Sequence, residues 1–228
     1  YMQNRYNITE LMKDHNKKRL FDMGYLLFDR KMKKGIDYFV SNNKITKLIT
    51  LESPTPLYLP EPVTGRKRTF DEDWYFSVYS MEKHMASFKN ASEHYKSVAQ
   101  FLIDNVTENT FTKIGIPQDV VGEIIGGADS PNYCTLYEYV MIFSEKWNNL
   151  SRSTNSSICL NSNGQLPVEE ALRDILSCFK LPGEGQVIAR IMTYISYAYV
   201  KADTAVIKHH QICNGLMFAI VMLNTDLH

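Results

Sequence analysis

The strongest constraint on the fold is a helical spacing of apolar residues that recurs along the chain. Between Val168 and Phe179 the apolar positions follow the i, i+3, i+4, i+7 pattern of one helix face, and Pro167 suits the first turn of that helix. The six positions are Val168, Ala171, Leu172, Ile175, Leu176 and Phe179. No sustained alternation with a period of two competes with this pattern. The sequence therefore predicts an all-α fold of several short helices.

Further helices are predicted by the same spacing elsewhere. It recurs at Ile188, Ile191, Met192, Ile195 and Tyr199, and at Leu136, Tyr139, Val140 and Phe143; shorter matches occur at Val98, Phe101 and Leu102, and at Val120, Val121, Ile124 and Ile125. From Ile212 to Leu223 the chain is apolar nearly all round. That composition predicts a helix enclosed by other helices.

Composition and charge exclude several classes of protein. The chain has 228 residues, of which 44% are apolar and 22% charged, which is typical of a globular protein. Its 25 basic and 25 acidic residues balance, so no overall field favours nucleic acid as a partner. The four cysteines form no C-x-x-C pair, which argues against a zinc ribbon or a disulfide scaffold and favours a reducing compartment. The most apolar stretch, Gly215 to Leu223, is too short to span a membrane, which takes roughly 20 residues.

Two segments interrupt the helical pattern. From Thr50 to about Ser80 the chain carries four prolines and a basic run at 66–68, a combination that predicts a long loop. From Trp147 to Gln165 it is rich in Asn and Ser and ends at Asn163-Gly164, which is a turn signal.

A tight turn between two predicted helices carries an acidic side chain. Pro182-Gly183 ends the first helix, and the next begins at or near Glu184. Gly183 and Gly185 leave little bulk around this carboxylate, so a partner could approach it closely. Taken alone the pattern is common, because acidic residues are favoured at helix starts.

Longer strings around this turn resemble a known family. The string FKLPGEGQVIAR (179–190), with ALRDIL (171–176) upstream and FAIVMLNTDLH (218–228) at the end, closely resembles the two signature motifs of the Sec-seven domain. That domain is the catalytic module of Arf-family guanine nucleotide exchange factors. Weaker similarity extends to FDRKMKKGI (28–36) and VAQFL (98–102). We interpret 1–228 as a single domain of this kind, with insertions at 50–95 and 147–165.

The resemblance implies a fold and a set of site residues. The fold would be an all-α right-handed superhelix with a hydrophobic groove near its C-terminal half. Glu184 matches the family's glutamic finger. The groove that binds the G protein would include Gly183, Gln186, Ile188, Met192, Phe218, Val221, Met222, Asn224 and Asp226. For any one of the apolar residues among these, a purely structural role in the core is the alternative.

The resemblance also implies a function. The partner would be a GDP-bound Arf-family small GTPase, which becomes nucleotide-free as Glu184 repels the β-phosphate and competes for Mg²⁺. No cofactor, metal or covalent chemistry is needed. The family implies a cytoplasmic protein, peripheral on Golgi or endosomal membranes, that regulates vesicle trafficking and contacts the membrane only indirectly. A non-catalytic helical interaction module that uses the same groove, or a scaffold with neither property, is the alternative.

Some positions depart from the family pattern. Ala189 stands where the family usually has Asp, which removes a polar contact to the G protein. The chain stops at His228 where family members continue with Asn-Pro and further helices, so we expect the C-terminal helices to be truncated. Phe218-Ala219 resembles members insensitive to brefeldin A, whereas Asp226 resembles sensitive ones, which leaves the inhibitor response open.

Other candidate sites are weaker. His209, His210 and Cys213 place potential metal ligands on neighbouring turns, but without a second cluster such a set is usually incidental. Gly126-Gly127 is better interpreted as the cap of the preceding helix than as a phosphate-binding loop. The chain has no recognisable nucleophile elbow of a hydrolase.

Overall fold

The computed structural model describes residues 15–24, 27, 32–45, 78, 81–82, 85, 89–107, 115–127, 130–150 and 158–227. Its helices are α2 (Met32–Ser41), α4 (Lys89–Asn105), α5 (Gln118–Gly126), α6 (Ser130–Asn148), α7 (Val168–Leu176), α8 (Gly185–Lys201) and α9 (His210–Leu227). Within these residues the strands are β1 (Val106–Thr107) and β2 (Ile116–Pro117), which pair in parallel. The all-α prediction is confirmed. Most of the predicted loop at 50–80 and the string at 28–31 lie outside the described residues.

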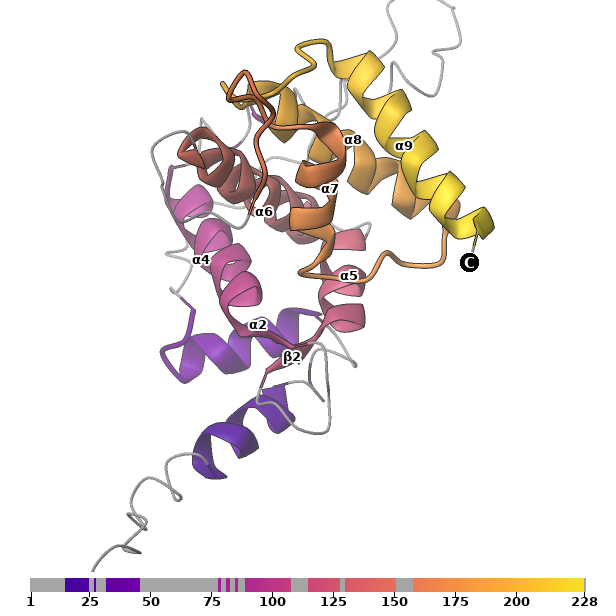
Figure 1. The fold of residues 1–228 in the computed structure, drawn as a ribbon. Helices are drawn as coiled ribbons and strands as arrows, with labels where there is room; N and C mark the ends of the chain where they lie inside the picture. Colours follow the sequence, from indigo (N-terminus) through magenta and orange to yellow (C-terminus); the bar gives the residue numbers. More distant parts are fainter. Residues whose placement is uncertain are drawn as a thin grey trace, which may run out of the picture.

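Four helices form the centre of the molecule. α4 packs on α6, α6 on α8, and α8 on α9 (Figure 1). The apolar stripes predicted from the sequence face inward along this row, with Leu102, Leu136, Tyr139, Ile195 and Tyr199 fully buried. Burying such side chains stabilises the fold by about 1.5–3 kcal/mol each before the entropy of ordering is subtracted.

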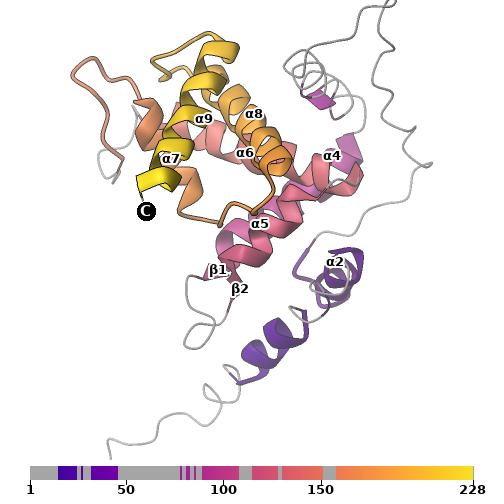
Figure 2. The ribbon, with the colours of Figure 1, turned by 90° about the vertical axis from the view of Figure 1, so that its right-hand side faces the viewer.

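Two shorter helices cover this row. α5 follows directly on β2 and packs against α6 and α8, while α7 contacts α6, α8 and α9 (Figure 2). The segment that joins α7 to α8 runs along α5 (Figure 1). The start of α8 is therefore close to α5, although more than 50 residues separate them in the sequence.

The first described helical residues, 15–24, dock onto α4 through aromatic rings. Phe21 stacks on Phe101 with 6.0 Å between ring centroids, and Phe39 of α2 lies 4.6 Å from Phe101. All three rings are buried. Gly24 permits this approach, because a Cβ there would lie 2.1 Å from the Phe39 ring.

One expectation about α9 was wrong. Its Cys213, Met217 and Val221, spaced by four residues, are buried against the fold, but Ile212 and Leu223 are 61% and 62% exposed. The helix is apolar all round, yet among the described elements it packs mainly on α8 and α7, which cover only one of its sides. It lies at the surface and is not enclosed.

Both predicted insertions include residues that the structure describes. α4 begins at Lys89, so the first insertion, drawn to residue 95, would overlap a helix of the core. At the start of the second, Trp147 and Leu150 are buried. At its end the Asn163-Gly164 turn is present as predicted, with Gly164 at a φ of +71° that suits glycine.

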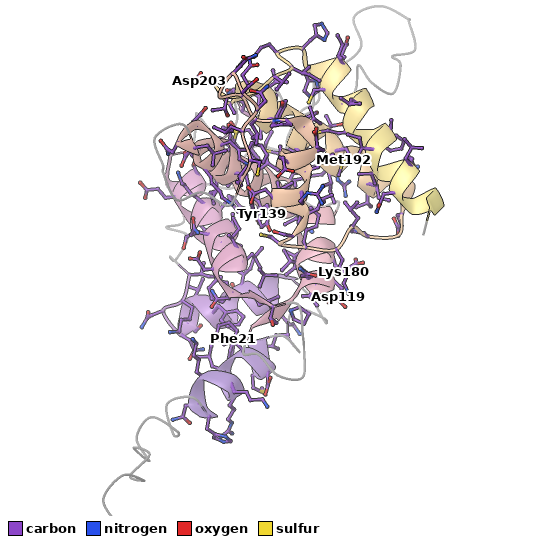
Figure 3. All side chains as sticks on the ribbon, viewed as in Figure 1. Phe21, Asp119, Tyr139, Lys180, Met192 and Asp203 are labelled. Carbon is purple, nitrogen blue, oxygen red and sulfur yellow. The ribbon has the colours of Figure 1, made fainter. Side chains whose placement is uncertain are left out.

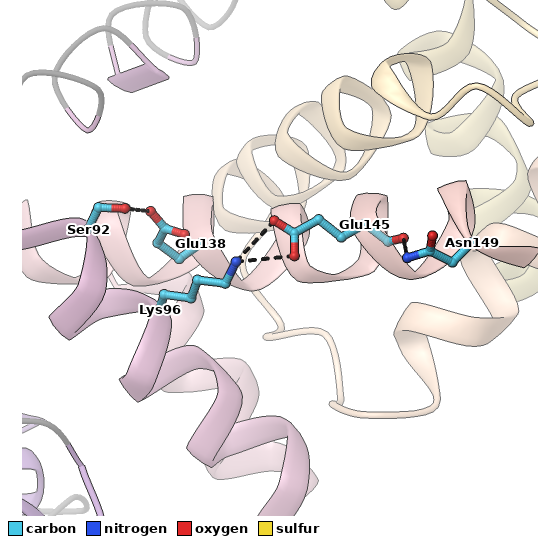
Figure 4. A network of polar contacts seen from close by, with 5 residues as sticks. All are labelled: Ser92, Lys96, Glu138, Glu145 and Asn149. Atoms are coloured by element: carbon cyan, nitrogen blue, oxygen red, sulfur yellow. Dashed lines mark hydrogen bonds and ion pairs between the residues drawn. The ribbon is translucent and has the colours of Figure 1, made fainter. Parts of the chain in front are cut away.

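Polar contacts join α6 to its neighbours. Toward α4, Ser92 donates to Glu138 at 2.6 Å and the Lys96 ammonium lies 3.0 Å from Glu145, as Figure 4 shows. Toward α7, Asp174 accepts hydrogen bonds from Lys146 at 2.6 Å and from the indole of the buried Trp147 at 2.9 Å.

None of the helices in the described part of the chain combines the length and apolarity that crossing a bilayer would require.

We expect Asp174→Ala to destabilise the protein by about 1–3 kcal/mol, because the buried indole N–H of Trp147 would lose its acceptor. Glu145→Ala is the matched control: it removes an exposed ion pair with Lys96 and should cost less than about 1 kcal/mol. Urea unfolding followed by circular dichroism measures both. Equal losses in the two variants would contradict this assignment.

Candidate functional site

The turn between α7 and α8 is anchored on its inner side and open on its outer side. Phe179 is 2% exposed and meets the ring of Tyr139 edge-on, at 6.0 Å between centroids. Pro182 is also buried, whereas the four residues from 183 to 186 are exposed. The segment therefore holds its apolar side chains in the core and presents a short polar loop outward.

The helix that ends at Leu176 was predicted to reach Phe179. It ends earlier because the following backbone bonds to α5: the Lys180 N–H donates to the Gln118 carbonyl at 3.0 Å. This bond places Lys180 at the start of α5, and Figure 3 labels it close to Asp119, which lies in the first turn of α5. A tertiary hydrogen bond of this kind cannot be read from local periodicity.

Glu184 is the N-cap residue of α8, with an extended backbone at φ −91° and ψ 122°. Its carbonyl accepts the N–H of Ile188 at 3.0 Å, as the first bond of the helix. Its side chain is exposed, makes no cap hydrogen bond, and forms no polar contact with any residue that the structure describes. The carboxylate stands at the positive end of the α8 dipole and remains available to a partner.

The glycines beside Glu184 are not required by the fold. A Cβ at Gly183 or Gly185 would meet no atom of the described residues within 4 Å, and neither residue has a positive φ. By contrast, a Cβ at Gly127 would lie 1.5 Å from the side-chain nitrogen of Asn132. An added side chain at Gly127 would therefore displace the buried Asn132 side chain, whereas the two glycines of the turn leave its outer surface without side-chain bulk.

The other predicted residues of α8 lie at different depths. Gln186 is exposed and Ile188 is half-buried, so both can contribute to a surface next to Glu184. Met192, labelled in Figure 3, belongs to α8 and has no exposed surface. It lies in the core beneath that surface and cannot touch a partner in this conformation.

The predicted residues of α9 are divided in the same way. Phe218 is 36% exposed, Met222 is half-buried and Asn224 is exposed, whereas Val221 is 8% exposed and belongs to the buried stripe. The side chain of Asp226 lies outside the described residues.

Helix geometry divides the exposed side chains of α9 between two flanks. A helix turns about 100° per residue, which puts Phe218 and Met222 on one flank of the buried stripe. The other flank carries Ile212, Leu216 and Leu223, which are 61%, 42% and 62% exposed. Sequence reasoning missed this second flank, because an all-round apolar helix shows no period that would separate its faces.

Arg190, next to the unusual Ala189, has a structural position. It is 6% exposed, and its guanidinium donates to the Gly126 carbonyl at the end of α5 and to the Tyr133 hydroxyl at 3.1 Å. It also lies 4.9 Å from the centre of the Tyr133 ring, a cation–π distance.

The alternative sites receive no support in the structure. His209 is exposed and Cys213 is buried, while the His210 Nε2 lies 3.1 Å from the Ser196 hydroxyl and burial lowers the pKa of its imidazole. Among the described residues no three His, Cys, Asp or Glu side chains are grouped as metal ligands. Gly126 does end α5, and Gly127 follows with an extended backbone at φ −60°.

Comparison with known proteins adds the following. Residues 67–228 match the family described as the Sec7 domain, the Sec-seven domain of the resemblance above. The chain is 35% identical over 133 residues to the ADP-ribosylation factor guanine nucleotide-exchange factor sec72 of Schizosaccharomyces pombe, covering 58% of this chain and 6% of the relative. It is 30% identical over 142 residues to human cytohesin-3, covering 58% of this chain and 31% of the relative.

A solved structure is also similar. The crystal structure of the Sec7p catalytic domain shares 24% sequence identity with a TM-score of 0.44, covering 72% of this chain and 78% of that one. The chain spans less than a third of the length of either curated relative named above.

We expect Gly183→Ala and Gly185→Ala to leave the fold intact and its stability unchanged or raised by up to about 1 kcal/mol, because alanine restricts the unfolded chain. Gly127→Ala should instead destabilise the protein, since its Cβ has no room beside Asn132. Urea unfolding of the three variants tests this. A loss of stability in the turn variants as large as that of Gly127→Ala would refute the bare, unstrained turn.

Proposed function

The chain belongs to the Sec7 domain family, and from this premise we propose that it is a guanine nucleotide exchange factor for an Arf-family small GTPase. The observation that carries the proposal is an exposed carboxylate, Glu184, with no partner among the described residues, on a turn that buried side chains hold in place. Two curated relatives, sec72 and sec71 of Schizosaccharomyces pombe, are named as ADP-ribosylation factor guanine nucleotide-exchange factors. Their names support the same activity here.

The proposed role of Glu184 is electrostatic. In a GTPase, GDP is held by backbone donors and a lysine around its phosphates and by a Mg²⁺ ion on the β-phosphate. A carboxylate brought to about 4 Å from that phosphate is repelled by roughly 4 kcal/mol at an effective dielectric near 20. It also offers Mg²⁺ and the lysine a competing anion. Because each 1.4 kcal/mol is about tenfold in rate, one such group accounts for a hundredfold or more without any covalent step.

The surroundings of Glu184 favour this role. Because buried side chains fix the turn, the Glu184 carboxylate is already in position before a partner binds. Binding free energy is therefore not needed to order it. Gly183 and Gly185 expose no side-chain bulk, which permits the nucleotide pocket of a partner to close around the carboxylate.

The proposed docking surface combines Ile188 with the flank of α9 that carries Phe218 and Met222. These side chains are partly exposed and apolar, as a surface for the apolar switch segments of a GTPase requires. Met192 and Val221 support it from below. A cytoplasmic site of action at Golgi or endosomal membranes, in vesicle trafficking, is part of this proposal.

We expect Glu184→Ala to slow GDP release from an Arf-family GTPase by about a hundredfold or more, in line with the repulsion energy above. Release of fluorescent GDP is measured at increasing concentrations of the chain. Glu184→Gln should lose as much, because it keeps the shape of the side chain and removes only its charge. Glu169→Ala, which removes an exposed acid from α7, is the control and should retain wild-type release.

Binding measurements separate exchange from the alternative of a non-catalytic module. If wild-type protein binds the GTPase without accelerating release, the chain acts as a receptor and the exchange proposal fails. No saturable binding at all would identify a scaffold.

We expect Phe218→Asp to weaken productive binding, seen as a higher KM for the GTPase, because a charge would replace an apolar contact on the docking flank. Leu216→Asp introduces the same charge on the opposite flank of α9 and is the matched control. Titration of release rate against GTPase concentration gives both KM values. A larger effect of Leu216→Asp would assign docking to the other flank.

A further inference from the structure

We infer that α5 is the support that sets the position of Glu184, with Gly122 and Gln118 as positioning residues. The inference deepens the proposed function and rests on it, since the position of the carboxylate matters only if it acts on a nucleotide. Neither residue touches the exposed tip of the turn. Both contact the backbone that leads into it.

Gly122 makes the closest approach. Its Cα face meets the carbonyl of Lys180, and a Cβ at this position would lie 1.9 Å from that oxygen and 3.1 Å from its carbon. Real Cβ atoms almost never come within 3.0 Å of another heavy atom. The residue is in the middle of α5, where glycine costs about 1 kcal/mol relative to alanine. Its presence there is explained by the backbone of the turn lying directly on the helix.

Gln118 fixes the same segment by two hydrogen bonds. Its carbonyl accepts from the Lys180 N–H at 3.0 Å, and its side-chain Nε2 donates to the Ser177 carbonyl at 2.6 Å. Ser177 caps the end of α7. The two bonds therefore tie both the end of α7 and the start of the turn to the first residue of α5.

The far side of the turn rests on the last residue of α5. A Cβ at Gly126 would lie 3.0 Å from the ring of Pro182 and 2.8 Å from the side chain of Val187 in α8. Pro182 precedes Glu184 by two residues and Val187 follows it by three. α5 thus contacts the chain before and after Glu184, and this bracket fixes where the carboxylate stands.

The support of the turn by α5 leads us to expect a measurable loss of release rate when Gly122 is substituted. Placing a methyl group at Gly122 forces the Lys180 carbonyl to move by on the order of 1 Å, and a displacement of about 1 Å can cost a catalytic group up to a hundredfold in rate. The docking surface on α9 is not part of the bracket. The loss should appear in kcat and leave KM nearly unchanged.

The experiment measures release of fluorescent GDP from an Arf-family GTPase at increasing GTPase concentration. Gly122→Ala should lower kcat at least tenfold with KM within about threefold of wild type. Gly24→Ala is the matched control, since its Cβ would lie 2.1 Å from the Phe39 ring, in the N-terminal helical residues that pack on α2 and α4 and not on α5. It should keep the wild-type kcat per folded molecule. Gln118→Ala removes one hydrogen bond without crowding and should lower kcat by a smaller factor.

Amide hydrogen exchange of the same variants gives a readout that does not depend on nucleotide release. The Lys180 amide should be protected in the wild-type chain and in Gly24→Ala, and should exchange faster in Gly122→Ala. It should also exchange faster in Gln118→Ala, which keeps the carbonyl that accepts from Lys180 but removes the side-chain bond that ties Ser177 to the same residue. If Gly122→Ala does not fold, Gln118→Ala decides by both readouts.

The outcomes separate this inference from the proposed function. Wild-type kcat in a folded Gly122→Ala whose Lys180 amide exchanges fast would overturn the positioning role while leaving exchange intact. If the wild-type chain does not accelerate release, the proposed function fails. The support of the turn by α5 is then tested by amide hydrogen exchange alone, and unchanged protection of Lys180 in Gly122→Ala and Gln118→Ala would overturn it.

Discussion

The buried guanidinium of Arg190 is the interaction on which the arrangement of the site depends. A cation removed from water is tolerated only with good partners, and here they come from two other helices: the last carbonyl of α5, at Gly126, and the ring and hydroxyl of Tyr133 in α6. The carbonyl stands at the negative end of the α5 dipole, which suits a cation. Arg190 ties α8 to the end of α5. It thereby fixes where α8 begins, and so the distance that the segment between α7 and α8 must span.

The helices of the core could be predicted from the sequence because each carries an apolar stripe of one period. Most stripe residues from Val98 to Tyr199 are buried within helices. The exceptions are Phe179, which is buried but lies beyond the end of α7, and Val120, Leu176 and Ile188, which are half-buried. The prediction was wrong for the environment of α9, because a uniformly apolar helix indicates burial in general and does not say which faces its own chain covers. The short pairing of β1 with β2 was not predicted either, since two residues per strand are too few to show a period.

The site could be predicted only in part, for a related reason. Glu184 was found because a motif surrounds it, and the start of α8 beside it because Pro182-Gly183 ends the previous helix. Its support by Gln118 and Gly122 was not found, because those residues lie about sixty positions upstream and contact backbone carbonyls of the α7–α8 segment, which leave no pattern in the sequence. Met192 resembles a surface residue by motif and is buried by packing.

The empty surroundings of Gly183 and Gly185 have a consequence for how such a chain can change over time. None of the residues that the structure describes rests on the tip of the turn, so substitutions there have no effect on folding within that part of the chain. Under the proposed function, a lineage could therefore lose nucleotide release in one step and keep a well-folded chain. Only selection for the proposed activity would preserve the acid and its two glycine neighbours.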